Sequence, residues 1–447
     1  MENKRKDRGK LGVIKYLWRE NKVSIEYRYV RPKKAEILQQ MNSQEFVNRT
    51  DLSCIYLNNA LVLPVKKDSV MPFGLGGVVD ESGEYVQESG IPYRFGGGYD
   101  NIAEQYIDKK VVYCGCLVNH WGHFLIESVA RLWYFLKNDS SIDEYVFVSE
   151  FSNKSQIKGN YKEFLELLGI YDRVQIVSKP TRFREVILPE LGYMRGGYYS
   201  EDYKKIFNVI RDRALVKKNF YIIEPERLFL SRSIFAKKSE AGVDMLDDFF
   251  LRNNYYVLRP ENVSLSEIIC LLNSVKTCAA ESGTLPHNFL FCEDGKEVLI
   301  IERQDTVNET QIDIDRMKKL QVTYIDGFYT IYPVAVSFGP YYLAYNDYMK
   351  KYAQDYMLMS PSPRYLSERY SKKCISKYMR VYRSNYGYMW GIGKWQVTYA
   401  PLFWESYSDT CLDIGEYLSG RKAFKVSQCF RISYLKRMLS RIIRGLK

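Results

Sequence analysis

The order of apolar and polar residues alternates between strand-like and helix-like segments over most of the chain. Short apolar runs indicate buried strands, and apolar residues at steps of three and four indicate helices. The first part of the pattern predicts strands at 111–118, 144–148, 174–177 and 186–188, and helices at 123–136, 161–168 and 202–216. The later part predicts strands from 227 and at 255–258, 277–280 and 297–301, and helices at 243–253 and 265–275.

Strands that alternate with helices favour parallel, doubly wound sheets. We therefore predict an α/β fold with two Rossmann-like domains that face each other across a cleft. The glycine-dense segment 74–86 predicts a hairpin whose turn is Asp80–Gly83. The expected units are a basic N-terminal arm at 1–34, a first Rossmann-like domain at 35–216, a second at 217–330, and a basic, Tyr-rich helical extension at 331–447.

The chain is long enough for two cores, and its charge is unevenly distributed. It has 447 residues, of which 46% are hydrophobic and 26% are charged, as is typical of globular proteins. The net charge is +12, and the segment from Ile331 onward alone has 19 Lys and Arg against 7 Asp and Glu. We find no signal peptide and no uninterrupted apolar run of membrane-spanning length, which predicts a cytoplasmic protein. Nine cysteines without a Cys-x-x-Cys pair predict reduced thiols.

All three histidines of the chain lie in two strand-to-helix loops. His120 and His123 follow the strand 111–118, and Glu127 comes four residues after His123, where a helix would place both side chains on one face. His287 lies in the second loop, 280–288. Because ligands of open α/β sheets bind at such loops, the pattern predicts one shared site, although an isolated histidine is more often structural.

Two segments are suited to a phosphate group. Ser231 and Arg232 end an apolar strand, and an arginine presents paired donors that match phosphate oxygens. Gly283 allows a ligand to approach the backbone, and the helix expected to follow it would present free N–H groups to an anion. We therefore predict that the two segments hold opposite sides of one diphosphate.

These residues resemble glycosyltransferase family 61, whose bacterial members are capsular polysaccharide biosynthesis proteins. The resemblance covers roughly 70–301 and consists of short motifs. Its residues are Asn119, His123, Phe124, Glu127 and Arg131 in the first loop, Leu230-Ser231-Arg232 in the second half, and then Gly283, Thr284, His287 and Asn288. The resemblance implies a GT-B-like architecture, a nucleotide-sugar donor and inversion at the anomeric carbon, usually without a required metal.

The resemblance also implies a role for each matched residue. His123 and Glu127 fall at active-site positions, and Arg232 at a donor-diphosphate position beside Ser231. The donor-binding turn would contain Glu281, Gly283, Thr284, His287 and Asn288. Asn119, His120 and Arg131 are further candidates in the first loop, and His120 and Pro286 depart from the family pattern. The residue types agree with an inverting transfer, which needs a base for the acceptor hydroxyl and cations for the leaving diphosphate.

Other interpretations compete with this one. His120, His123 and His287 could hold a metal ion in a hydrolase. The basic segment 430–446 follows helical spacing and could lie on an anionic membrane surface, and the protein could bind acidic polysaccharide without catalysis. Asp313-Ile314-Asp315 resembles a metal-binding Asp-x-Asp, but its position in a polar helical segment predicts a solvated helix face.

The expected protein is thus an inverting glycosyltransferase that moves a sugar from a UDP-linked donor to a capsular or other cell-surface polysaccharide, or to a lipid-linked oligosaccharide. We expect no required cofactor, no nucleic-acid partner, and a cytoplasmic location at the inner face of the cell membrane through the C-terminal helix.

Overall fold

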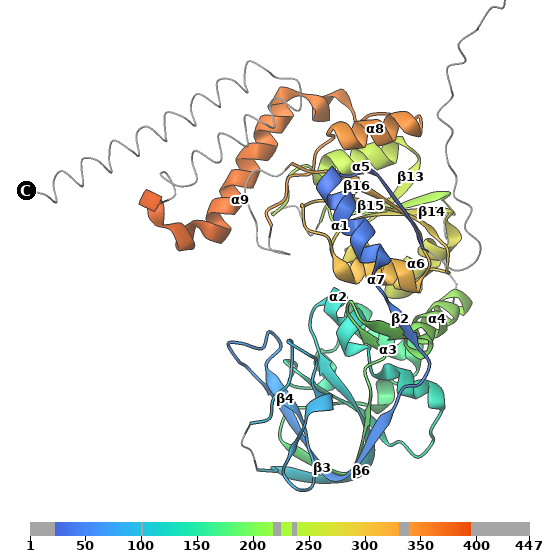
Figure 1. Cartoon of the computed structure of the whole chain (residues 1–447), viewed down its shortest axis with the longest axis vertical. Helices are drawn as coiled ribbons and strands as arrows, with labels where there is room; N and C mark the ends of the chain where they lie inside the picture. The colour runs from blue at the N-terminus through green and yellow to red at the C-terminus, as the bar shows by residue number, and fades with distance from the viewer. Residues whose placement is uncertain (1–22, 100–101, 218–224, 235–238, 330–338, 395–447) are drawn as a thin grey trace, which may run out of the picture.

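The computed structural model describes residues 23–99, 102–217, 225–234, 239–329 and 339–394. The fold is α/β, with one large mixed sheet and one large parallel sheet (Figure 1). The mixed sheet is built from the first half of the chain, and the parallel sheet from the second half and a segment near the N-terminus. The predicted tail helix at 430–446 lies outside the described residues.

The first sheet has seven strands in the order β5-β4-β3-β9-β6-β7-β8. Their bounds are Cys54–Lys66 (β3), Leu75–Val79 (β4), Tyr85–Val86 (β5), Gln105–Leu117 (β6), Glu144–Ser149 (β7), Val174–Val177 (β8) and Thr181–Pro189 (β9). Strands β9, β6, β7 and β8 are parallel, whereas β3 is antiparallel to both β4 and β9. The expected parallel, doubly wound sheet is therefore wrong for this half. The connection at 67–74 is shorter than the dozen or so residues that a parallel crossover needs.

Short helices cover one face of this sheet, and a small sheet lies beside it. The helices are η1 (Gln87–Ser89), α2 (Trp121–His123), η2 (Phe124–Ser128), η3 (Leu132–Lys137), η4 (Lys154–Gln156), α3 (Gly159–Leu168), η5 (Tyr171–Arg173) and α4 (Glu201–Val216). The small sheet joins β2 (Val47–Arg49), β10 (Tyr193–Met194) and β11 (Tyr198–Ser200). In place of the single helix predicted at 123–136, the chain forms three short helical pieces.

The second sheet has six parallel strands in the order β1-β16-β15-β14-β12-β13. They are Ser24–Tyr29 (β1), Arg227–Leu230 (β12), Tyr255–Leu258 (β13), Thr277–Glu281 (β14), Glu297–Glu302 (β15) and Gln321–Asp326 (β16). Its helices are α1 (Pro32–Ser43), α5 (Val243–Arg252), η7 (Pro260–Asn262), α6 (Leu265–Ser274), η8 (Leu285–Phe291), α7 (Glu309–Met317), α8 (Asp347–Asp355), η9 (Pro363–Leu366) and α9 (Glu368–Lys394). Helices α1, α6 and α7 pack on one face, and α5 and α8 on the other.

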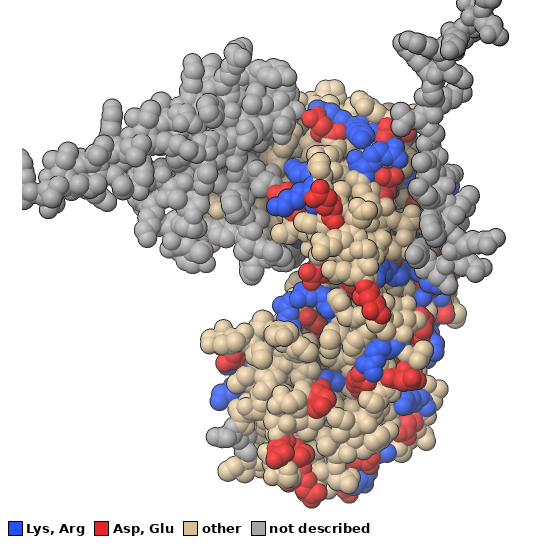
Figure 2. Space-filling view, viewed as in Figure 1, with Lys and Arg blue, Asp and Glu red and all other residues tan. Residues whose placement is uncertain are grey.

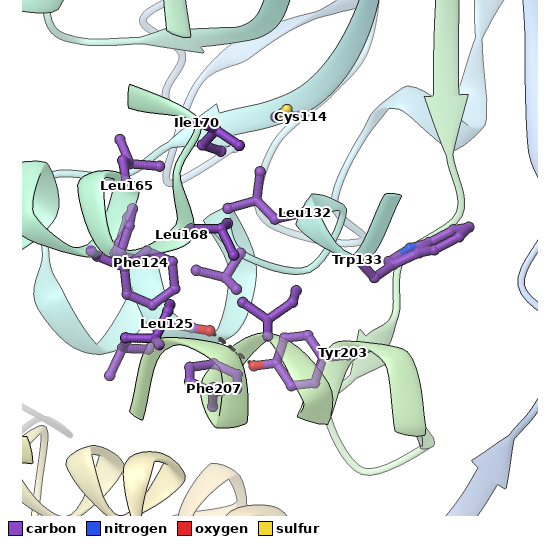
Figure 3. Close-up of a cluster of buried hydrophobic side chains, with 14 of the residues drawn as sticks. Cys114, Phe124, Leu125, Leu132, Trp133, Leu165, Leu168, Ile170, Tyr203 and Phe207 are labelled. Atoms are coloured by element: carbon purple, nitrogen blue, oxygen red, sulfur yellow. Dashed lines mark hydrogen bonds between the residues drawn. The ribbon is translucent and has the colours of Figure 1, made fainter. Parts of the chain in front are cut away.

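A hydrophobic core joins the two halves. Figure 3 shows part of it, in which Phe124 and Leu165 lie near Phe207 of α4, and the Tyr203 hydroxyl donates to the Leu125 carbonyl at 2.9 Å. The same core continues into η8, where the Phe291 ring lies 5.5 Å from that of Phe207. The outer surface of the α6, η8 and α7 layer therefore packs directly against α3 and α4, where the sequence predicted an open cleft.

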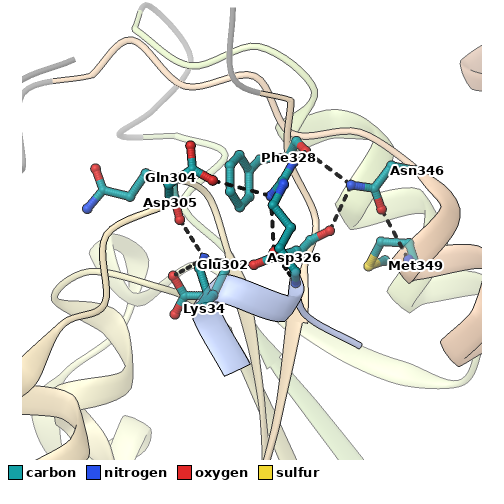
Figure 4. A network of polar contacts seen from close by, with 9 residues as sticks. Lys34, Glu302, Gln304, Asp305, Asp326, Phe328, Asn346 and Met349 are labelled. Carbon is teal, nitrogen blue, oxygen red and sulfur yellow. Dashed lines mark hydrogen bonds and ion pairs between the residues drawn. The ribbon is translucent and has the colours of Figure 1, made fainter. Parts of the chain in front are cut away.

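The N-terminal segment belongs to the second sheet. Strand β1 pairs in parallel with β16, and α1 follows it, so residues 24–43 complete the parallel sheet. This differs from the expected arm at 1–34 and the expected domain start at 35. Figure 4 shows how the segment is fixed at the carboxyl ends of β15 and β16. The buried Lys34 ammonium lies 2.7 Å from Asp326 and 3.4 Å from Glu302, and Arg31 contacts Asp326 at 3.1 Å.

Replacing Lys34 by alanine is expected to lower the free energy of unfolding by about 3 kcal/mol, because it leaves Glu302 buried without its cation. Arg31 still faces Asp326 and limits the loss. Lys33→Ala is the matched control, because Lys33 is exposed, and it should change the unfolding free energy by less than about 0.5 kcal/mol. Denaturant titration of both variants measures the difference, and equal losses would contradict the role given to Lys34.

The described surface carries charges of both signs. On the face drawn in Figure 2, Lys and Arg are intermixed with Asp and Glu over both halves. Among the described residues, no helix combines the length and the apolar character needed to cross a bilayer. The seven described cysteines are free thiols, and all except Cys54 are buried.

Candidate functional site

The strand order of the second sheet reverses between β12 and β14. The connection after β12 runs through α5 on one face, to β13, whereas the connection after β14 runs through η8 on the other face, toward β15. Such a reversal opens a crevice at the carboxyl ends of the two strands, where open α/β sheets bind ligands. The residues at these ends are Ser231 and Arg232 after β12, and Ser282 and Gly283 after β14.

His123 and Glu127 form a hydrogen-bonded pair in the first half of the chain. The His123 Nδ1 atom lies 2.7 Å from Glu127 Oε2, and the side chains are 31% and 14% exposed. Because a carboxylate accepts, Nδ1 carries the proton in this pair and Nε2 is left as the basic nitrogen. Arg94 approaches the other Glu127 oxygen at 3.8 Å, and the Phe73 ring packs edge-on against His123. The pair is therefore oriented from two sides.

A π-helical turn carries this pair. Residues 124–128 form η2, and the Val129 amide donates to the Phe124 carbonyl at 3.1 Å, five residues back. A π-turn inserts one extra residue into a helix and is frequent at functional sites. The Ser128 hydroxyl ties this turn to β6, because it donates to the Cys116 carbonyl at 2.8 Å and accepts from the Val118 amide. The turn therefore has a fixed position at the carboxyl end of β6.

The two histidine-bearing loops are in direct contact. Gly122 lies against the second loop so closely that a Cβ atom there would stand 3.0 Å from His287 Nδ1 and 3.1 Å from Thr284 Cγ2. The Trp121 indole N–H donates to Asn288 Oδ1 at 3.0 Å. A glycine at 122 suits this close contact, because a Cβ atom there would require the His287 and Thr284 side chains to shift by a few tenths of an ångström. The structure thus brings together the loops 119–123 and 283–288 from opposite halves of the chain.

The two outer histidines differ in environment. His287 is buried, its Nε2 lies 3.3 Å from the Asn308 amide, and its Nδ1 has no hydrogen-bond partner in the described part of the chain. Burial, together with His123 and His120, lowers the pKa of His287 to about 3, so its ring is neutral near pH 7. His120 is more exposed. It caps α2 by accepting from the His123 amide, and partial burial of its ring lowers its pKa.

Two arginines meet at Gly283. The Arg232 and Arg303 guanidiniums each lie 3.0 Å from the same oxygen, Oε1 of the buried Glu240. A Cβ atom at position 283 would stand 2.6 Å from Arg303 and 3.5 Å from Arg232, and Gly283 has a φ of +120° that side chains disfavour. The Arg303 guanidinium also covers the Tyr341 ring at 4.2 Å. Arg303, which follows β15, and Glu240 were not among the candidates from the sequence.

Glu281, at the end of β14, lies in the same cluster. It is fully buried, and neither carboxyl oxygen has a hydrogen-bond partner within the described ranges. Burial, together with Glu240, raises the pKa of Glu281 to about 8, although Arg232 and Arg303 act in the opposite direction. Glu281 is thus largely protonated near pH 7.

Ser231 belongs to a separate hydrogen-bond network. Its hydroxyl donates to Asp247 at 2.5 Å, and Asp247 accepts from Arg259 at 3.0 Å.

The remaining candidates of the first loop have separate environments. Asn119 is exposed at the start of the loop. Arg131 is 1% exposed and donates to the main-chain carbonyls of Glu88, Gly90 and Pro189. This arrangement is typical of a structural arginine, which joins β9 to the segment before β6.

The prediction of a solvated Asp313–Asp315 face is wrong, because both carboxyls are buried. Asp313 accepts from the Tyr193 hydroxyl at 2.9 Å and from the Gly196 amide, and Asp315 accepts from the Tyr324 hydroxyl at 2.6 Å. Burial raises the pKa of Asp313 to about 6 and that of Asp315 to about 7. These two residues hold α7 to its neighbours.

The described residues contain no group of three or more His, Cys, Asp or Glu side chains arranged to hold a metal ion. The best-formed chemical constellation is the His123–Glu127 pair, whose loop contacts the 283–288 turn through Trp121 and Gly122, with two arginines beside Gly283. No family model matches the sequence, and no curated protein shows significant similarity to it.

Proposed function

We propose that this protein is an inverting glycosyltransferase that uses a nucleotide-sugar donor, with a GT-B-like division into an acceptor half and a donor half. The observation that carries the proposal is the contact between the two loops. One loop contains His123, whose Nδ1 is held by Glu127 and whose Nε2 is available. Gly122 of the same loop packs against the 283–288 turn, and this turn begins at Gly283, beside Arg232 and Arg303. A base and a cationic anion site on adjoining loops are the two elements that such a transfer requires.

The geometry supports a role for each residue of the pair. His123 Nε2 takes the proton of the acceptor hydroxyl, and Glu127 stabilises the imidazolium through Nδ1. The acceptor oxygen then forms its bond to the anomeric carbon from one side while the bond to the diphosphate breaks on the other, which inverts the centre. The electron pair of the broken bond leaves with the diphosphate, whose charge Arg232 balances at the crevice between β12 and β14.

The substrate classes extend the same proposal. The donor is a UDP-linked sugar, and the acceptor is a cell-surface polysaccharide or a lipid-linked oligosaccharide, as the resemblance to family 61 implies. The basic segment from Ile331 onward would keep the enzyme beside an acceptor held at an anionic membrane surface.

A panel of nucleotide sugars tests the proposal. We expect one member to raise the melting temperature by about 3 °C or more at a large excess, and to be slowly hydrolysed with water in place of the acceptor. NMR of the released sugar at early times should show the anomer opposite to that of the donor. A panel in which no nucleotide sugar stabilises the protein or is hydrolysed would contradict the proposal.

A further inference from the structure

A buried polar cluster lies at the carboxyl ends of β12, β14 and β15, and it has more hydrogen-bonding capacity than the described residues use. Its buried atoms without a partner among them are both carboxyl oxygens of Glu281 and Oε2 of Glu240. Buried polar groups in folded proteins nearly always have a partner, since leaving one unpaired is costly. Several unpaired groups in one place therefore point to a ligand that supplies the missing bonds.

The charges of the cluster indicate what part of the ligand binds there. Arg232 and Arg303 share one carboxylate, Glu240, and Glu281 is mostly neutral near pH 7, so these four groups have a surplus of positive charge. Two guanidiniums that converge on one small volume match the oxygens of a phosphate or diphosphate. They disfavour a bare divalent cation for the same reason. Gly283 keeps a side chain out of this volume, because a Cβ atom there would stand 2.6 Å from Arg303 and 3.5 Å from Arg232.

The acid groups indicate the rest of the ligand. A carboxyl with unused oxygens accepts hydrogen bonds from hydroxyl groups and, when protonated, also donates one. A ligand that satisfies arginines and acids together carries phosphate oxygens next to hydroxyls. The diphosphate and the adjoining sugar of a nucleotide sugar have this combination, whereas inorganic diphosphate has only the first part.

We propose that Arg303 is the second arginine of the donor-diphosphate site, and that Glu281 binds a hydroxyl of the sugar or ribose next to that diphosphate. This inference rests on the proposed function for the identity of the ligand. It assigns binding roles to both residues at the ends of β15 and β14. Glu240 orients the two guanidiniums, because one of its oxygens contacts both.

Calorimetric titration of the full chain with UDP and with inorganic diphosphate tests the role of Arg303. We expect Arg303→Ala to weaken the binding of both probes at least about 10-fold, and Arg303→Lys to restore only part of it. Arg227→Ala is the matched control. Arg227 lies at the amino end of β12, whereas the cluster lies at the carboxyl ends of the strands, so this variant should bind both probes as wild type does. The inference would be overturned if Arg303→Ala bound UDP and diphosphate as tightly as wild type does. It would also be overturned if wild type bound neither probe.

The role of Glu281 is tested by the pH dependence of UDP binding. Ionisation of Glu281 near pH 8 places a negative charge beside the bound anion, among Glu240, Asp247, Arg232 and Arg303. Wild-type affinity should therefore fall as the pH rises from 7 to 9, whereas Glu281→Gln should show a flat profile. Identical pH profiles would overturn this part of the inference.

The two levels of the proposal fail differently. Weaker UDP binding by Arg303→Ala in a protein that transfers no sugar would support the site and contradict the proposed function. Sugar transfer by wild type, with UDP binding unchanged in Arg303→Ala, would support the function and overturn the inference.

Discussion

Replacing His123 by alanine is expected to lower the turnover of sugar transfer by about 100- to 10,000-fold, the range in which a positioned general base contributes. His123 Nε2 is the only nitrogen of the ring not engaged by Glu127, so no other atom of this side chain can take the proton. Replacing Glu127 by glutamine should lower turnover by a smaller factor, because the amide still contacts the ring but no longer stabilises the imidazolium. Turnover at saturating donor and acceptor is the quantity to compare.

The double variant sharpens this test. If His123 and Glu127 act as one unit, combining the two substitutions should lower turnover little beyond His123→Ala alone, as residues of one catalytic unit behave non-additively. Lys158→Ala is the control, because Lys158 is exposed just before α3 in the same half of the chain, and it should retain nearly full turnover. Retention of wild-type turnover by His123→Ala, with UDP binding intact, would remove His123 from the mechanism.

Replacing Arg131 by alanine is expected to destabilise the protein by about 5 kcal/mol, enough to leave much of it unfolded. The substitution leaves the buried carbonyl of Pro189 and the partly buried carbonyls of Glu88 and Gly90 without their charged donor. Each lost hydrogen bond to a charged group costs about 1.5 to 3 kcal/mol. The expected loss is thus larger than for any surface arginine.

Two further variants separate structure from function at this position. Arg184→Ala, on β9 of the same sheet, removes a guanidinium that is 52% exposed, and it should change the unfolding free energy by about 0.5 kcal/mol or less. Arg131→Met keeps the length of the side chain and should recover part of the packing but not the hydrogen bonds. If Arg131→Ala were as stable as wild type and had lost only its transfer activity, Arg131 would act in catalysis and its structural role would be minor.

The sequence pattern predicted the second sheet better than the first. Strands β12 to β15 are short, continuous apolar runs, and their observed bounds agree with the predicted ones to within a residue or so. Strand β3 escaped prediction because Asn58, Asn59 and Pro64 interrupt its apolar residues, and Asn59 takes a left-handed φ of 51°. Strand β1 escaped because its sequence, SIEYRY, has too few apolar residues to stand out without its neighbour β16.

For the candidate site, the sequence predicted which loops meet, but it did not predict most of the side-chain contacts. The scarcity of histidine identified the two loops that the structure brings together, and the spacing of His123 and Glu127 predicted their contact. Arg303 escaped notice because an arginine after a strand is ordinary, and its meaning depends on Glu240 and Arg232 from other strand ends. The burial of Asp313 and Asp315 depends on tyrosines from distant segments, such as Tyr193, which a local pattern does not reveal.

The pairing of β1 with β16 affects how the chain can fold during its synthesis. Arg31 and Asp326, which join these strands, are 295 residues apart. A ribosome that adds about 5 to 20 residues per second needs about 15 to 60 s to cover that distance. The edge of β1 therefore leaves the exit tunnel well before its partner strand, and Lys34 leaves before either carboxylate that neutralises it. A chaperone that shields this N-terminal stretch would protect the nascent chain from aggregation until the last strand of the parallel sheet has been made.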